Sequence, residues 1–250
     1  MKEPETGEAP ATAAVLVIGD EILSGRTQDT NTRYIATYLA QIGVDLREAR
    51  VVPDVEEEIV AAVNALRARY TYLFTTGGIG PTHDDITADS VGRAFGVEVI
   101  EDPRAMAMLR ERFAEEELNP ARRRMARIPR GAELVCNAIS KAPGFWIGNV
   151  IVMAGVPVIM QSMMDTVGPQ LRSGARVEVE TVEAGSIPEG SYAMRLEEIA
   201  AAHPGVSVGS YPNFSGQGVR NQIVLRSRDV ASLASAKAAV RALLAELAGA

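Results

Sequence analysis

Apolar runs alternate with amphipathic stretches over the first two thirds of the chain. The runs are nearly continuous in aliphatic residues and several end at a glycine, which is typical of strands buried on both faces of a parallel sheet. They predict strands at 13–19, 44–52, 70–76, 97–100 and 149–155. Between them, apolar residues at helical spacing predict helices at 32–42, 55–70, 87–95, 103–117 and 157–171. This order predicts an α/β fold: a three-layer, mostly parallel sheet.

The pattern changes after Ser173–Gly174. An alternating stretch at 176–184 predicts a strand, and it is followed by a helix at 190–203, strands at 206–211 and 219–226, and a helix at 230–247. We read 209–218 as a loop between strands. The sequence thus predicts a disordered tail over 1–11, an α/β domain over 12–172 and a small C-terminal α+β domain over 173–250.

Composition narrows the class of protein. The chain has 250 residues, 47% of them apolar, and a net charge of −7, which argues against a nucleic-acid partner. No apolar run reaches the ~20 residues of a membrane helix. We expect a cytoplasmic protein, because there is one cysteine and no leader at the N-terminus. That residue, Cys136, has no base near it in the sequence, so we expect it to be small and buried.

The stretch "TTGGIGPTHDD" follows a predicted strand and precedes a predicted helix. Gly77, Gly78 and Gly80 can adopt positive φ and form a nest of N–H groups, and the helix N-terminus adds partial positive charge. The loop is neither a Walker loop nor a GxGxxG fingerprint. It is either a phosphate site, to which Thr82 also belongs, or a tight turn.

Two neighbouring acids, Asp84 and Asp85, close this loop. One of them can cap the next helix. Beside a bound phosphate, these carboxylates need a cation between them and the phosphate. Mg²⁺, held by one or two carboxylates and by ligand oxygens, meets this need. The sequence therefore predicts a divalent metal at Asp84 and Asp85.

Other polar residues follow neighbouring strands and are expected at the same edge of the sheet. Asp20, Glu21, Ser24 and Asn31 follow the first strand, and each alone also fits a turn or a cap. The segment 137–149 adds Gly144 and an aromatic pair, Phe145 and Trp146, which we expect in the core.

Five arginines lie close together at positions 122, 123, 124, 127 and 130. They form either a solvated helix surface or a patch that meets phosphate, and the second interpretation requires that they face the glycine loop. The two histidines, His83 and His203, fall in different predicted domains and do not make a metal site.

The motifs "VIGDEILSGRTQDTNTRYIATYLAQIGVDL", "VVPD" and "TTGGIGPTHDDIT" together resemble the MoaB/Mog-type molybdopterin-binding domain, and most of all its CinA-like branch. The resemblance continues through "RIPRGAELVCNAISKAPGF", "AGVPVIMQSM" and "SVGSYPNFSGQGV". It covers nearly everything after residue 12, and the glycine-loop signature is its most specific part.

The resemblance implies a pterin or nucleotide-diphosphate pocket on the glycine loop, with Asp85 and Asp54 implicated in function. CinA-like proteins are associated with metal-dependent ADP-ribose pyrophosphatase activity, and we expect no nicotinamide-mononucleotide deamidase activity from this chain. Three positions depart from the family pattern, and they put catalysis in question more than the fold. Ser140 stands for a usual glycine, Ala154 for a proline and Ile159 for a glutamate.

Two functional hypotheses follow. The first is an enzyme that cleaves ADP-ribose or a similar substrate, with Mg²⁺ at Asp84 and Asp85, N–H groups of Gly78 and Gly80 taking up charge, and Glu21 or Asp54 orienting metal or water. The second is a module that binds molybdopterin or a related nucleotide without turnover. In both, the partner is a small phosphate-containing ligand. Family resemblance points to a homo-oligomer, a dimer or a trimer.

Overall fold

The computed structural model describes residues 10–215 and 218–249, so the predicted tail lies almost entirely outside the described residues. The chain divides into two compact units, and the boundary in the sequence falls between Gly174 and Ala175. Within the described ranges, no helix is both long and apolar enough to cross a membrane.

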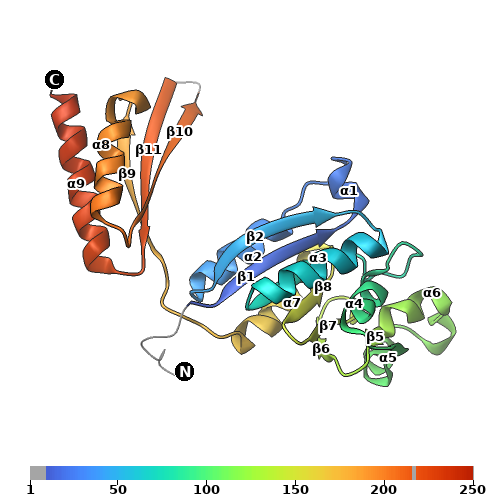
Figure 1. Ribbon diagram of the computed structural model, residues 1–250. Helices are drawn as coiled ribbons and strands as arrows, with labels where there is room; N and C mark the ends of the chain where they lie inside the picture. Colours follow the sequence, from blue (N-terminus) through green and yellow to red (C-terminus); the bar gives the residue numbers. More distant parts are fainter. Residues whose placement is uncertain (1–9, 216–217, 250) are drawn as a thin grey trace. The chain divides into compact units, whose positions relative to one another are not determined.

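A mixed, mostly parallel six-stranded sheet forms the centre of the first unit (Figure 1). In spatial order its strands are β2 (Asp45–Val52), β1 (Thr12–Ile18), β3 (Tyr72–Thr76), β8 (Val150–Met153), β7 (Gly144–Ile147) and β6 (Glu133–Val135). The first four run parallel, and β7 is antiparallel to both of its neighbours. The parallel strands therefore end at one edge of the sheet, which positions the loops that follow them.

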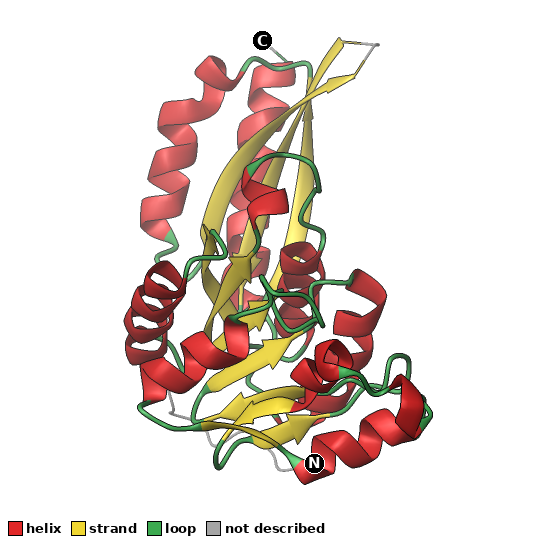
Figure 2. Ribbon diagram, turned by 90° about the vertical axis from the view of Figure 1, so that its right-hand side faces the viewer, coloured by secondary structure: helices red, strands yellow, loops and turns green. Residues whose placement is uncertain are grey.

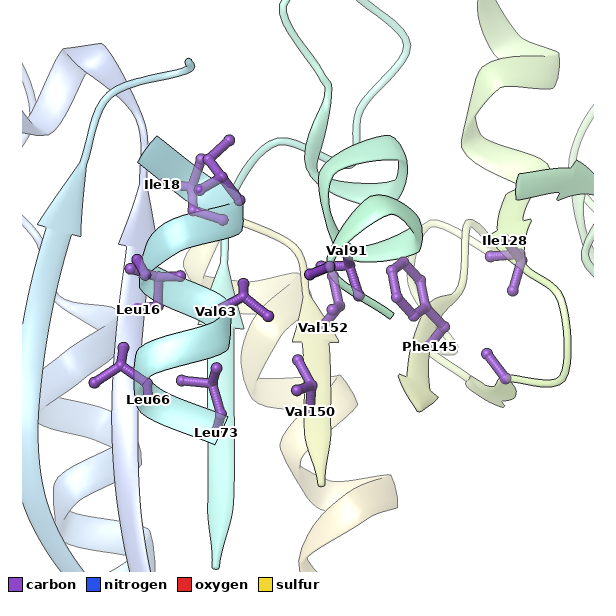
Figure 3. Close-up of a cluster of buried hydrophobic side chains, with 14 of the residues drawn as sticks. Leu16, Ile18, Val63, Leu66, Leu73, Val91, Ile128, Phe145, Val150 and Val152 are labelled. Atoms are coloured by element: carbon purple, nitrogen blue, oxygen red, sulfur yellow. The ribbon is translucent and has the colours of Figure 1, made fainter. Parts of the chain in front are cut away.

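Helices cover both faces of this sheet, which makes three layers. One face packs against α3 (Glu56–Arg69), α4 (Thr87–Phe95) and α5 (Pro103–Arg110), as Figure 3 shows for Leu16, Val63 and Val91. The other face packs against α2 (Asn31–Gln41) and α7 (Pro157–Val167). Side chains of β1 alternate between the two cores, so both faces are apolar and the strand is an uninterrupted apolar run.

Short elements complete the first unit, and sequence periodicity did not find most of them. They are α1 (Asp20–Leu23), a two-stranded sheet of β4 (Val99–Glu101) and β5 (Arg127–Pro129), η1 (Glu115–Glu117), α6 (Pro120–Arg123), η2 (Arg124–Ala126) and η3 (Gly168–Gln170). Strands of three or four residues show too little alternation to be recognised.

Three local expectations for the first unit were wrong. The helix from Pro103 ends at Arg110, and the chain turns before η1. The helix from Pro157 ends at Val167, where Gly168 and Pro169 begin a 3-10 turn. Cys136 is exposed, because both of its neighbours in the chain point inward and it points outward.

The second unit is a three-stranded antiparallel sheet with two helices on one face. The strands lie in the order β10 (Ser207–Ser215), β11 (Gly218–Ser227) and β9 (Glu178–Gly185). Helices α8 (Glu189–Ala202) and α9 (Val230–Ala248) pack against the sheet around Tyr192 and Leu225 (Figure 1). The predicted α+β order is observed, but residues 209–215 belong to a long strand and not to a loop (Figure 2).

The aromatic pair of β7 packs in the cores of the first unit, as expected. Phe145 is buried. Trp146 is half-buried, donates a hydrogen bond from its indole N–H to the Gly148 carbonyl at 2.9 Å, and meets Tyr72 edge-on. The only tryptophan of the chain is thus held inside the first unit.

Candidate functional site

The loops after the four parallel strands gather at the carboxyl edge of the sheet. Gly19, after β1, donates its N–H to the Val52 carbonyl of β2 at 3.1 Å. Gly77, after β3, donates its N–H to the Met153 carbonyl of β8 at 3.2 Å. These bonds continue the strand pairing by one residue, so the polar loops that follow start from a common line.

The glycine pair after β3 is required by the backbone. Gly77 has φ 104° and Gly78 has φ 66°, a region that favours glycine. A side chain at Gly77 would collide with the Ile18 carbonyl, and one at Gly78 with the Thr87 hydroxyl. Thr87 also donates its hydroxyl to the Gly77 carbonyl and its N–H to the Gly78 carbonyl, each at 3.0 Å. The start of α4 therefore holds the turn in shape.

The Asp85 carboxylate braces the loop from within. One of its oxygens accepts a hydrogen bond from the Gly80 N–H at 2.6 Å, and the other accepts from the Thr82 N–H at 2.7 Å and the Thr82 hydroxyl at 2.5 Å. The N–H groups of Gly80 and Thr82 thus bind the Asp85 carboxylate inside the loop, although the sequence predicted that these residues bind a phosphate. Asp85 as a metal ligand stays a prediction, and the structure gives this residue a positioning role.

Adjacent backbone donors at the start of the loop are free. Among the described residues, the N–H groups of Gly78 and Ile79 have no hydrogen-bond acceptor, in contrast to those of Gly77, Gly80 and Thr82. They are adjacent, and they follow a turn in which the preceding glycines have positive φ. Consecutive free N–H groups of this kind form an anion-binding nest.

Asp84 has the opposite character from its neighbour Asp85. Its side chain is 60% exposed, and His83 lies 3.9 Å from its carboxylate. The pKa of the Asp84 carboxyl is lowered, first by the nearby Thr82 hydroxyl and its own backbone N–H, and then by positive charge from His83 and Arg124. Asp84 is therefore an ionised carboxylate that solvent and ligands can reach.

Asp54, after β2, lies in a strongly acidic environment. Burial raises the pKa of its carboxyl, and the charges of Asp20, Glu21 and Asp84 raise it further. The Asp20 N–H donates to it at 3.0 Å and acts in the opposite direction. The Glu21 carboxylate lies against Gly19, at the end of β1. The candidate acids of three loops thus influence one another electrostatically.

This set of carboxylates fits a hard cation only together with a ligand. Carboxylate oxygens suit Mg²⁺. The pKa of Asp54 is raised first by burial and then by the neighbouring acids, and a cation would relieve the second of these effects. Yet the described residues contain no group of three or more acidic, histidine or cysteine side chains arranged to hold a metal ion. Oxygens of a phosphate ligand would have to complete the coordination.

The start of α2 contributes buried polar atoms to the same edge. The Asp29 carboxylate accepts hydrogen bonds from the N–H groups of Asn31 and Thr32, and the Asn31 amide donates to the Gly155 carbonyl at 2.7 Å. Asn31 is 6% exposed, and its side-chain oxygen has no partner. The hydroxyls of Thr32, Thr75 and Thr76 are also buried without a partner.

Buried polar groups are nearly always hydrogen-bonded, so these orphaned oxygens indicate a ligand or ordered water. Asn31 is predicted for this site from the sequence, whereas Thr75 and Thr76 are not. The available signal was a pair of hydroxyl residues at the end of an otherwise apolar strand.

Two other candidate residues have structural explanations. Ser24 is exposed at the end of α1 and donates its hydroxyl to the Glu21 carbonyl at 3.3 Å. Gly144 is buried in β7, where a side chain would collide with the Val152 carbonyl of β8. The close approach of two strands accounts for this glycine.

The three departures from the family pattern are accommodated locally. Ser140 accepts from the Asn137 amide and donates its N–H to the Asn137 side-chain oxygen, at 3.1 and 2.7 Å. Ala154 and Ile159 pack against the core between the sheet and α2 and α7. An apolar side chain at position 159 places no charge at this edge.

Comparisons with known proteins agree with this geometry. A family model described as "Probable molybdopterin binding domain" matches residues 14–173, more than half of the chain and all of the loops described above. The chain belongs to the molybdopterin-binding domain family. A second model, "FAD synthase, middle domain", matches residues 181–248 in the second unit.

Within the family, the chain is similar to CinA-like proteins. A CinA-like protein of Desulfosudis oleivorans is 35% identical over 214 residues, which are 81% of this chain and 52% of that protein. A protein of Pyrobaculum calidifontis is 34% identical over 211 residues, 80% of each chain. The chain spans about half the length of the CinA-like relatives it matches.

A solved structure shows the same fold. The crystal structure of CinA from Thermoplasma acidophilum is 32% identical, with a TM-score of 0.61, and the match covers 64% of this chain and 98% of that one. The resemblance read from the motifs is therefore confirmed for the family and for the fold.

Proposed function

We propose that the carboxyl edge of the first unit binds a phosphate-containing ligand, either a nucleoside-diphosphate sugar such as ADP-ribose or molybdopterin. The free N–H groups of Gly78 and Ile79 carry this proposal, because they form a nest at the start of a loop that Asp85 and Thr87 hold rigid. The unpartnered oxygens of Asn31 and Thr76 supply acceptors for the hydroxyl or amine groups of the rest of the ligand.

The activity that these groups support best is metal-dependent hydrolysis of a pyrophosphate bond. Asp84 and Asp54 are the carboxylates suited to hold a divalent cation against the ligand, and a bound cation would neutralise the charge of the diphosphate. Asp54, whose pKa is raised, would accept a hydrogen bond from the attacking water and orient it. The nest at Gly78 and Ile79 would hold the phosphate in place.

A binding module without turnover is the second candidate, and specific observations favour it. The Asp85 carboxylate is already engaged by Gly80 and Thr82, and Ile159 replaces an acidic residue of the family pattern. A site with fewer available carboxylates would bind molybdopterin or a nucleotide without cleaving it.

The deciding experiment combines turnover and binding on one set of proteins. AMP release from ADP-ribose is measured with Mg²⁺ or Co²⁺, and affinities for ADP-ribose and for molybdopterin are measured with chelator. The variant is Asp84→Asn, and the control is Glu58→Gln, which neutralises an exposed acid on α3.

Loss of at least tenfold in AMP release in Asp84→Asn alone, with chelated binding retained, supports the enzyme. If the wild type binds a ligand but releases no AMP, the result supports a binding module without turnover. A wild-type protein that binds neither ligand refutes both.

Two properties of the whole protein are also part of the proposal. We expect a homodimer or homotrimer in the cytoplasm, by resemblance to the family. Analytical ultracentrifugation of the purified chain measures its state of assembly directly, and a monomer at micromolar concentration contradicts the expectation.

A further inference from the structure

The arginine cluster between α6 and β5 contains one member that differs from the rest. Four of its five guanidinium groups are engaged by carboxylates. The pairs are Arg122 with Glu117, Arg123 with Glu101, Arg127 with Asp89 and Arg130 with Glu98. Arg124 makes no ion pair or hydrogen bond with any residue that the structure describes, and its Nε is buried without an acceptor.

Arg124 lies beside the glycine loop. Its side chain lines a hollow together with Gly78, Ile79 and Gly80 of the loop. Asp89, an acid that also lines this hollow, is held by Arg127 through two hydrogen bonds, at 2.6 and 2.7 Å. Asp85 also lines the hollow, but its carboxylate accepts hydrogen bonds from Gly80 and Thr82, and the charge of Arg124 acts on Asp84 without forming an ion pair.

The position of Arg124 offsets the repulsion between the acids of the site and an anionic ligand. Asp84 in the loop and Asp54, which lies within reach of its charge, repel an anionic ligand. Arg124 places a fixed positive charge next to the nest, and a guanidinium can bind two phosphate oxygens at once. A ligand with a second anionic group beyond the one in the nest would accept hydrogen bonds from this guanidinium.

We propose that Arg124 binds the second phosphate of a diphosphate ligand whose first phosphate lies on the N–H groups of Gly78 and Ile79. Arg124 is then a specificity residue that favours diphosphates over monophosphates at this site. The inference rests on the proposed function, since it needs a phosphate in the nest, and it adds the residue that selects for a second phosphate.

The test compares two probes that share one half, ADP-ribose and AMP, by calorimetry in the presence of chelator so that no hydrolysis intervenes. The variants are Arg124→Gln and Arg124→Lys. The matched control is Arg123→Gln, the adjacent arginine, whose guanidinium is engaged by Glu101. Thermal unfolding of each variant checks that it is folded.

We expect Arg124→Gln to weaken ADP-ribose binding at least tenfold while AMP binding changes less than twofold. Arg124→Lys keeps the charge but loses the two-pronged contact, so its loss should be intermediate. Arg123→Gln should bind both probes as the wild type does. If Arg124→Gln is poorly folded, the lysine variant alone decides, because a selective loss for ADP-ribose is expected there too.

The outcomes separate the two proposals. A wild type that binds neither probe refutes the phosphate site itself. A wild type that binds ADP-ribose, with unchanged affinity in both Arg124 variants, overturns the role of Arg124 alone. An equal loss for both probes also overturns it, because Arg124 would then contribute only general positive charge.

Discussion

The Asp85 carboxylate accepts the Gly80 N–H at 2.6 Å, across the turn that contains Pro81 and Thr82. Together with the two hydrogen bonds from Thr82, this contact closes the glycine loop on itself. The adjacent acid, Asp84, points to solvent and takes no part in the closure. Two neighbouring residues of one type thus have different tasks, and mutations can separate them.

Asp85→Asn is expected to open the loop. The amide provides one acceptor oxygen where the carboxylate provides two, so at least one donor of Gly80 or Thr82 loses its partner. We expect a loss of about 1–2 kcal/mol in stability and weaker ADP-ribose binding even with chelator. Chemical denaturation and calorimetry measure the two effects. Chelated binding as tight as in the wild type would contradict the bracing role.

Asp84→Asn is expected to act only where a cation is bound. The side chain is 60% exposed, so the free energy of unfolding should be nearly unchanged from the wild type. Mg²⁺ added to the wild type with ADP-ribose should raise Tm through linkage, and this increment should shrink in the variant. Differential scanning fluorimetry with and without Mg²⁺ gives the result, and an undiminished increment would remove Asp84 from the metal site.

Asp54→Asn should stabilise the metal-free protein. The raised pKa means that the folded state binds the proton more tightly than the unfolded chain, so the ionised carboxylate weakens stability at neutral pH. This penalty vanishes below the usual pKa of about 4 and is complete above the raised value. The variant should therefore have the higher Tm at pH 7, and the difference should close toward pH ~4. A lower Tm for the variant at pH 7 would mean that repulsion does not dominate there.

Gly78→Ala should lower the stability of the protein more than Gly96→Ala does, although the two glycines have the same φ. Gly96, at the end of α4, has the same φ of 66°, but a side chain there would have open space. Gly96→Ala should cost roughly 1–2 kcal/mol for the left-handed conformation. Gly78→Ala should cost more and abolish ligand binding, because the methyl group collides with the Thr87 hydroxyl. Equal losses of stability in the two variants would show that Thr87 yields freely.

The parts of the structure that the sequence predicts well are those with strong local causes. Apolar runs at β1 and β8 mark strands buried on both faces, and consecutive glycines after β3 mark a turn with positive φ. The short antiparallel strands β6 and β7 were missed because each contributes only three or four residues to the sheet. Their pairing is set by the neighbouring strands and not by their own pattern.

The sequence also predicts some features of the site and not others. The sequence brought Asp54, Asn31 and the glycine loop to one edge, because parallel strands end together. It did not distinguish Asp85 from Asp84, since which of two adjacent acids faces inward depends on the loop geometry. Nor did it single out Arg124 among five arginines, because the carboxylates that engage Arg123, Arg127 and Arg130 come from distant positions in the chain.

Trp146 in β7, edge-on to Tyr72, gives the first unit a spectroscopic signal of its own. The chain has no other tryptophan, so indole fluorescence follows the melting of the first unit alone, while far-ultraviolet circular dichroism follows both units. Denaturation curves that coincide for the two signals would show one cooperative transition, and curves that separate would show that the units melt independently. A single unlabelled sample is therefore enough to measure how far the stability of each unit depends on the other.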